Sequence, residues 1–378
     1  MMKPIYFSAL GGAQCVGSSC YYLRLGTSNV LLDCGVTKKD GLVFGPNLQP
    51  LVKGPFMQSF SELDHVYISH AHSDHVGYLN DLLQLAPNTA VYMTPLTRVL
   101  SEQRMDIDNS GLGRSSLKQM SIENHMKQCI DVSFMQQLRQ PQYRVAFFEA
   151  GHIPGAMMTL IEYEGRRILY TGDYSVDPAL GLSGCRLPEN LNVDVLIMCA
   201  LHAKHPYQRR QPNLRLHRAM EHLRWGQSVY LQVKEPSKVL EQLVNINTMM
   251  AEAGESYPIY LEASAMETIR LIEQLDTPIL QRNNFIMPDY VPEGAHVVIG
   301  AASKGSIRDN YRLLDSIYTL HEDYNEMKSF IKRINPRQAL LVHCAEGFGQ
   351  GTIEQELMLD PDCRTQVIFP QEGQIYTI

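Results

Sequence analysis

The apolar and polar positions predict many short strands in the first part of the chain and alternating strands and helices after it. Short apolar or alternating runs at residues 5–10, 21–25 and 30–33, separated by Gly, Ser and Asn, predict a meander of hairpins. Similar runs extend the predicted strands to residues 65–69, 91–93, 145–149, 158–163, 167–171 and 195–199. Within this part, residues 96–138 show helical spacing, so we expect helices there that border a functional site.

The pattern changes after residue 200. Predicted helices at residues 217–223, 237–250 and 265–274 alternate with predicted strands at 229–233, 259–261 and 297–300, which is typical of βα units around a mostly parallel sheet. A strand at 316–320 is expected to lead into a helix at 322–334. The predicted strands at 339–342 and 366–369 again resemble the short strands of the first 200 residues. The simplest organisation is a core built from residues 1–200 and 321–378, with an α/β cap inserted at 201–320.

Composition excludes several classes of protein. The chain has 378 residues, enough for two domains of about 150 residues, and its 44% hydrophobic and 19% charged residues exclude disordered and fibrous proteins. No apolar run reaches the roughly 18–20 residues of a membrane helix, and no signal peptide is recognisable. Eight scattered cysteines without a CxxC pair favour reduced thiols and a cytoplasmic location. The net charge of −7 argues against a broad basic nucleic-acid face, although it allows a local channel.

The most informative motif is His-Ala-His-Ser-Asp-His at residues 70–75, directly after a predicted strand. It places four side chains that can bind metal within six residues of a turn. Because they cannot all point one way, they can divide between two neighbouring ions. Histidine suits Zn²⁺, and aspartate adds a harder oxygen ligand. A solvated polar turn is the alternative interpretation, but it explains so dense a cluster poorly.

Three further residues with metal-binding side chains follow predicted strands, namely His152, Asp173 and His343. Taken singly, each is more often a turn or capping residue. Together with the motif they complete seven ligands of a two-metal site. In this interpretation His70, His72 and His152 bind one ion, Asp74, His75 and His343 bind the other, and Asp173 bridges the two.

These motifs also carry a family resemblance. HAHSDH at 70–75, GHIPGA at 151–156 and TGDY at 171–174 resemble the metallo-β-lactamase fold, an α/β protein built as an αββα sandwich with a dinuclear site at its edge. LGGAQCVGSSCYYL at 10–23 and LLDCG at 31–35 resemble the β-CASP branch of RNA-processing nucleases, in which a cap domain is inserted late in the fold. The similarity continues in order through GQSVYLQV at 226–233, HVVIGAASKG at 296–305 and INPRQALLVH at 334–343.

Two positions depart from the pattern of the branch. Cys199 stands where the family usually has an acidic residue, and residues 234–237 read Lys-Glu-Pro-Ser where it usually has an arginine-containing turn. The resemblance therefore identifies the branch but no particular subfamily.

The resemblance implies hydrolysis of phosphodiesters with two Zn²⁺ ions, or Mn²⁺ as the alternative metal. Such an ion pair, about 3.5–4 Å apart, lowers the pKa of a bound water and clamps phosphoryl oxygens. Asp74 is expected to align the attacking water. His321 is expected to protonate the leaving oxygen, since an unperturbed imidazole has a pKa of about 6.5; alternatively, His321 only precedes a helix N-cap. Ser303, Lys304 and Gly305 could bind substrate phosphate, although a plain surface turn explains them equally well.

The expected substrate is single-stranded RNA, because a histidine at the last ligand position, here His343, accompanies the RNA-processing members of the branch. Lys204, Arg209 and Arg210 could line a channel for the strand, or they could form a solvated loop. The alternatives are a single-stranded DNA nuclease, a thioesterase or lactonase of the same fold, and a binding protein with a degenerate site. We expect no membrane partner, and a homodimer is compatible with the sequence.

Overall fold

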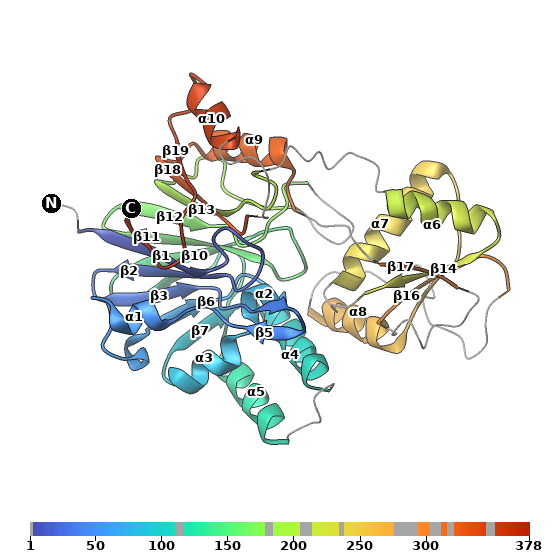
Figure 1. Ribbon diagram of the computed structural model, residues 1–378, viewed down its shortest axis with the longest axis horizontal. Helices are drawn as coiled ribbons and strands as arrows, with labels where there is room; N and C mark the ends of the chain where they lie inside the picture. Colours follow the sequence, from blue (N-terminus) through green and yellow to red (C-terminus); the bar gives the residue numbers. More distant parts are fainter. Residues whose placement is uncertain are drawn as a thin grey trace. The chain divides into compact units, whose positions relative to one another are not determined.

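The computed structural model describes residues 3–110, 116–177, 184–204, 214–233, 238–275, 293–301, 311–315, 321–344 and 352–378. The chain divides into two compact units (Figure 1). The first comprises Met1–Pro178, Ser183–Gln208 and His321–Ile378, and the second comprises Ala179–Leu182 and Arg209–Leu320. None of the helices within the described ranges is long and apolar enough to cross a membrane.

Two seven-stranded sheets form the centre of the first unit, as far as the described residues show. The first sheet has the order β20-β1-β2-β3-β6-β7-β8 and contains β1 (Ile5–Gly11), β2 (Cys20–Leu25), β3 (Ser28–Leu32), β6 (His65–Tyr67), β7 (Ala90–Met93), β8 (Ile130–Asp131) and β20 (Ile375–Thr377). The second has the order β19-β18-β13-β12-β11-β10-β9 and contains β9 (Gln137–Arg139), β10 (Arg144–Glu149), β11 (Met157–Tyr163), β12 (Arg166–Tyr170), β13 (Val195–Cys199), β18 (Gln338–Val342) and β19 (Gln366–Ile368).

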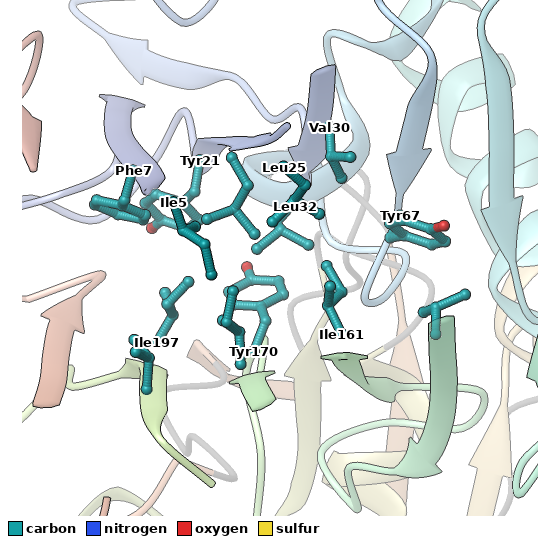
Figure 2. Packing of buried hydrophobic residues seen from close by; sticks show 14 of the residues in the cluster. Ile5, Phe7, Tyr21, Leu25, Val30, Leu32, Tyr67, Ile161, Tyr170 and Ile197 are labelled. Atoms are coloured by element: carbon teal, nitrogen blue, oxygen red, sulfur yellow. The ribbon is translucent and has the colours of Figure 1, made fainter. Parts of the chain in front are cut away.

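The two sheets pack face to face through their apolar side chains. Alternate residues of a strand point to the same face, so Ile5 and Phe7 of β1 face Ile168 and Tyr170 of β12 across one buried cluster. Figure 2 shows side chains from both sheets meeting in this layer, with the Tyr170 ring pointing toward the first sheet. This cluster is the main core of the unit.

Helices cover the outer faces of both sheets. The outer face of the first sheet packs against α1 (Gln49–Lys53), α2 (Ser73–Val76), α3 (Leu79–Leu85) and α5 (Ser116–Gln128). Phe60 of η1 (Phe60–Glu62) packs against the same outer cluster, and α4 (Pro95–Ser110) lies on this side of the fold (Figure 1). The second sheet is accompanied by α9 (Tyr324–Ile334) and α10 (Thr352–Leu359), and α10 contacts β19. The predicted αββα sandwich is therefore confirmed.

The second unit contains a parallel sheet with helices, as the alternating pattern predicts. Its strands β14 (Ser228–Gln232), β15 (Ile259–Leu261), β16 (Val297–Gly300) and β17 (Tyr311–Asp315) have the order β15-β16-β14-β17. All three pairings are parallel. The described helices are α6 (Leu214–Arg224), α7 (Lys238–Ala253) and α8 (Ala263–Leu275).

The structure corrects some predicted elements. Residues 96–138 contain α4 and α5, but their last part forms β8 and the start of β9, because pairing with β7 and β10 decides the conformation of these short runs. A small hairpin of β4 (Thr37–Lys39) and β5 (Leu42–Phe44) was not predicted. The strand predicted at 316–320 lies outside the described residues.

The two ends of the chain meet in the first sheet. Strand β20 pairs antiparallel with β1, with Tyr6 opposite Thr377. The guanidinium of Arg166 donates hydrogen bonds to the carbonyl oxygens of both Ile378 and Lys3. Residues before and after the second unit therefore complete the same sheet.

Candidate metal centre

The seven predicted ligands come together at one edge of the sandwich. His70 and His72 follow β6, Asp74 and His75 lie on the short helix α2, and the other three follow β10, β12 and β18. Strands β12, β13 and β18 are mutually parallel, and so are β3 and β6, so the loops after them emerge at common edges. The sandwich thereby gathers residues that are up to 273 positions apart, from His70 to His343.

Their ligand atoms form two groups. One atom from each of His70, His72, His152 and Asp173 lies within 4.8 Å of the others, and Asp74, His75 and His343 form a second such group. Asp173 lies between the groups, because its Oδ2 is 3.6 Å from His70 Nε2 and 3.4 Å from His75 Nε2. The grouping corresponds to the predicted division into two ions, and the binding of metal itself stays a prediction.

The chemistry of this cluster fits divalent metal ions. All of its members except Asp74 are buried. Oδ1 of Asp173 is buried and accepts no hydrogen bond from any described residue. A buried carboxylate oxygen without a donor is unfavourable unless an ion or water compensates it. Imidazole and carboxylate are ligand types that zinc and other divalent transition metals use in proteins.

A further aspartate, Asp33, holds the cluster in place. Its carboxylate accepts hydrogen bonds from the backbone N–H of Ser69 at 2.6 Å and from the Ser69 hydroxyl at 2.7 Å. It also contacts Nδ1 of His75 at 2.7 Å and accepts from the hydroxyl of Tyr170 at 2.5 Å. Such partners fix the orientation of a ligand histidine. Sequence reasoning assigned Asp33 no role, although a buried aspartate at the end of an apolar strand was the available signal.

Two residues at the centre adopt left-handed backbone conformations. Asp33 has φ 60° and His343 has φ 55°, values uncommon for residues other than glycine. His343 is held by two contacts: its N–H donates to the carbonyl of Gly12 at 2.7 Å, and its Nδ1 lies 3.1 Å from the hydroxyl of Ser19. Backbone strain of this kind persists where surrounding contacts determine the conformation, often at functional sites.

The backbone of the HAHSDH turn packs against the segment that follows β3. The N–H of Cys34 donates to the carbonyl of His75 at 2.7 Å, and that of Val36 donates to Ser73 at 2.9 Å. A Cβ at Gly35 would lie 1.8 Å from the carbonyl oxygen of Asp74. Glycine is therefore required for this close approach, which gives the LLDCG motif its place beside the ligands.

The carboxylates and imidazoles alter one another's ionisation. Burial opposes protonation of His75, but the facing carboxylates of Asp173, Asp74 and Asp33 raise its pKa well above the ordinary value. Burial by itself would raise the pKa of Asp173, yet the facing imidazoles of His75, His343 and His321 hold it well below the usual range. These contacts favour the ionised form of Asp173, which is the form in which a carboxylate binds metal.

His321 lies against the cluster, directly before α9. Its Nε2 is 3.7 Å from Asp173 Oδ2, and its ring centre is 4.7 Å from that of His152. Burial lowers the pKa of His321 well below its ordinary value. Asp323 is the N-cap of α9 and forms a capping box with Glu326. His321 therefore does precede a helix N-cap, as the alternative interpretation states. This location does not exclude a chemical role for its side chain.

Cys199 is the neighbour of His321. Its Sγ lies 3.6 Å from His321 Nδ1, and burial raises the pKa of the thiol well above its usual value. Cys199 also forms a third potential ligand group with Asp173 and His343. Sequence reasoning identified Cys199 only as a departure from the family and missed this possibility.

Some of the predicted site residues cannot be placed. Ser303, Lys304 and Gly305 lie outside the described residues, as do Arg209, Arg210 and the turn at 234–237. Lys204 is described and lies in the first unit.

The fold and the site together define a class of protein: an αββα sandwich with a buried cluster of histidines and aspartates at its edge. Residues 13–191 match the family model of the metallo-β-lactamase superfamily. This match, together with the relatives described next, confirms the resemblance to the metallo-β-lactamase superfamily and to its β-CASP branch.

Two curated relatives are archaeal proteins. "Probable RNase MJ4" of Methanocaldococcus jannaschii is 27% identical over 272 residues, which cover 69% of this chain and 60% of the relative. "RNase aCSPSF2" of Saccharolobus solfataricus is 24% identical over 295 residues, which cover 76% of this chain and 57% of the relative. The chain thus spans less than two thirds of the length of these relatives.

A solved structure shares the fold along the whole chain. It is a protein of unknown function from Enterococcus faecalis V583, with a TM-score of 0.65, 14% sequence identity and full coverage of both chains. At this identity the similarity shows the fold alone.

Proposed function

We propose that this chain is a metal-dependent phosphodiester hydrolase that cleaves single-stranded RNA. The observation that carries the proposal is the position of Asp173 between two groups of ligand atoms, with His321 against it. The relatives named as RNases support the choice of RNA over other substrates of the fold.

The proposed cofactor is a pair of Zn²⁺ ions, with Mn²⁺ as the alternative. One ion would be held by His70, His72 and His152, the other by Asp74, His75 and His343, and Asp173 would contact both. When bound, such a pair lowers the pKa of water and neutralises charge on phosphoryl oxygens.

The residues of the chain supply positioning and proton transfer. Asp74 is the one partly exposed member of the cluster, and its Oδ2 lies 3.8 Å from His343 Nε2 and 3.9 Å from His75 Nε2. It is therefore placed to orient an attacking water. Nε2 of His321 lies on the cluster side of the ring, which places it to give a proton to the leaving oxygen. Because burial lowers the pKa of this imidazole, the fraction that carries the proton increases as the pH falls.

The test compares three substrates: end-labelled single-stranded RNA, single-stranded DNA of the same sequence, and a chromogenic ester. After reconstitution with Zn²⁺ or Mn²⁺ we expect about two ions per chain by elemental analysis, and cleavage of RNA that chelator abolishes. Asp173→Ala should lose metal and activity together. Absence of bound metal, or hydrolysis of the ester with RNA left intact, would contradict the proposal.

His321→Ala separates proton transfer from metal binding. We expect turnover to fall by about 10²–10⁴-fold while metal content stays native, because His321 is assigned to the leaving group. His217→Ala, an exposed histidine on α6, is the matched control and should leave both unchanged. Loss of metal in His321→Ala would assign His321 to the ligands instead.

Two other properties also stay proposals. We propose a cytoplasmic location, which cell fractionation can test. A homodimer would appear in light scattering as twice the 42.8 kDa of the chain.

A further inference from the structure

A cavity of about 520 Å³ lies in the first unit, away from the ligand atoms themselves. Strand β19 and the residues after it supply an apolar wall of Val367, Ile368 and Phe369. The remaining described wall is polar and consists of Gln14, Lys204, Glu354, Gln355 and Gln371. Cavities of this size commonly hold a small organic ligand.

Lys204 is the unusual residue of this wall. It is only 8% exposed, yet it forms no hydrogen bond or ion pair with any residue in the described part of the chain. Its Nζ lies 6.0 Å from the centre of the Phe369 ring, at the outer limit of a cation–π contact. The Nζ atom is not among the buried side-chain atoms that lack a partner, so the stem of Lys204 is covered while its ammonium is open to the cavity.

No described residue of the lining pairs with this ammonium, so it is available to an anionic ligand. Glu354 is the one carboxylate among the described lining residues, and it is exposed on α10 and forms no ion pair with Lys204. The three glutamines supply neutral amides that can donate and accept hydrogen bonds, and Phe369 supplies an aromatic side chain. This combination suits a ligand with an anionic group and a flat, polar-edged body.

The cavity is connected through the backbone to the metal centre. Lys204 is five residues beyond Cys199, in a loop that begins with the Ala200 N–H donating to the Val342 carbonyl at 2.8 Å. On the other side, Gln14 follows Gly12, whose carbonyl accepts from the His343 N–H at 2.7 Å. The loop that carries Lys204 and the segment that carries Gln14 are therefore both hydrogen-bonded to the backbone at or next to His343.

We propose that this cavity binds a nucleotide phosphate through Lys204, with the base held by the glutamine amides and the apolar wall of β19. The phosphate could belong to the RNA strand under cleavage, in which case the inference rests on the proposed function, or to a free mononucleotide. The chemistry is the same for both sources, and the experiment separates them.

The experiment measures binding in the full-length Asp173→Ala chain, which does not cut RNA. The probes are a fluorescent ten-residue oligoribonucleotide, adenosine 5′-monophosphate and inorganic phosphate, each titrated at several salt concentrations. The variants added to this background are Lys204→Met, which keeps length and removes charge, and Lys53→Met, the matched control on exposed α1.

We expect Lys204→Met to weaken binding of at least one phosphate probe about tenfold or more, since a hydrogen bond to a charged group is being removed. If the source is the strand, the slope of log affinity against log salt should fall by about 0.7 for the oligoribonucleotide, the value of one phosphate contact on a single strand. If the source is a free nucleotide, the monophosphate should lose affinity and the oligoribonucleotide should not. Lys53→Met should change neither.

Gln355→Glu provides a second variant that does not disturb the interior, because Gln355 is exposed on α10. Its new carboxylate should weaken binding of the same probe severalfold. Unchanged affinity for all three probes in both variants would overturn the proposed cavity site, even if the native chain cleaves RNA. Conversely, loss of monophosphate binding in a chain whose native form cuts no RNA would support the cavity site and refute the proposed function.

Discussion

Asp33 shows how much of the site depends on a residue that binds no metal in the proposed arrangement. One carboxylate receives four contacts, from two atoms of Ser69, from Tyr170 and from His75. All of these groups are buried, so water cannot replace the carboxylate if it is removed. The position of the His75 ring is therefore determined by Asp33 before any metal binds.

Replacing Asp33 with Asn should weaken metal binding by about 10–100-fold, because Asn presents an N–H₂ group toward donors. The unfolding free energy should fall by about 1–3 kcal/mol for the donors left unsatisfied. Competition with a chromogenic chelator measures the first effect, and urea unfolding measures the second. Asp64→Asn is the matched control: Asp64 accepts one backbone hydrogen bond from Asn29, so stability should fall slightly with metal affinity unchanged. Native metal affinity in Asp33→Asn would contradict this role.

Cys199 leads to a prediction about turnover. A buried neutral thiol at 3.6 Å orients the His321 ring weakly, whereas an aspartate extends further and is a stronger acceptor. Cys199→Asp should therefore raise turnover on RNA by about tenfold at unchanged metal content, and Cys199→Ser should have little effect. If metal content changes in either variant, Cys199 acts instead as a ligand, with Asp173 and His343.

The cluster of candidate ligands could be predicted from the sequence because four of its members lie in one six-residue motif. The residues that support them could not, since their contacts are long-range: Ser19 and His343 are 324 positions apart, and Asp33 and Tyr170 are 137 apart. Single residues of such common types carry no local signal of a partner elsewhere in the chain.

At the scale of elements, the start of α9 positions His321. The Asp323 side chain accepts from the Glu326 N–H at 2.9 Å, and Glu326 in turn accepts from the Asp323 N–H at 2.7 Å. The preceding residue, Glu322, accepts from the Val176 N–H at 2.6 Å and so ties the helix start to the loop after Asp173. The helix cap thereby also determines where the His321 ring lies.

Asp323→Ala should lower the unfolding free energy by about 1 kcal/mol, the usual effect of losing an N-cap. It should also lower turnover on RNA while metal content stays native, because the His321 backbone becomes less constrained. Asp360→Ala removes an exposed ion pair to Lys332 at the other end of α9 and should leave turnover unchanged. Equal turnover in the two variants would show that the cap does not position His321.

A polar cluster between the two sheets predicts a pH dependence of stability. His65 of β6 contacts the hydroxyl of Tyr143 at 2.8 Å, and Tyr143 contacts Tyr67 at 2.8 Å. Burial lowers the pKa of His65 from 6.5, and nearby Asp64 opposes this only partly. The folded state therefore binds fewer protons than the unfolded state, so this contribution is complete above about pH 6.5 and is lost as the pH falls through the folded pKa.

We expect the unfolding free energy of the native chain to fall more steeply between about pH 7.5 and pH 5 than that of His65→Gln. Urea unfolding at intermediate pH values measures the difference between the two. Parallel curves would mean that His65 is as easily protonated in the fold as in the unfolded chain.

Most strands could be predicted from local patterns, whereas the edges of the sheets could not. Predicted strands such as 195–199 and 259–261 coincide with β13 and β15, because both are short apolar runs in the sheets. By contrast, β20 is three residues long and mostly exposed, so its local pattern does not distinguish it from a loop, and its pairing with β1 makes it a strand.

At the scale of the whole molecule, the first unit is discontinuous in sequence. In its second sheet, β13 precedes the inserted unit in the sequence and its partner β18 follows that unit. His343 comes directly after β18. The second unit interrupts this one between Gln208 and His321. The metal centre therefore needs both parts of the first unit.

A circular permutant tests whether the first unit is autonomous. A short linker would join residue 378 to residue 3, and the chain would begin at residue 321, end at residue 208 and omit the second unit. Because Arg166 contacts the carbonyls of both Lys3 and Ile378, the linker spans a short gap. We expect a cooperative thermal transition and about two metal ions per chain, with RNA cleavage greatly reduced. A permutant that does not fold, although the native chain does, would show that the second unit is needed for the stability of the first.

The pairing of β1 with β20 also affects the chain while it is being synthesised. During synthesis β1 emerges from the ribosome long before β20, so one side of β1 has no partner while the intervening 363 residues, 12–374, are made. An open strand edge is a template for pairing with other chains, and contacts between distant segments form slowly. The edge of β1 in the newly made chain therefore stays open to such pairing until β20 is released, and the permutant, in which β20 directly precedes β1, would shorten that interval to the length of a linker.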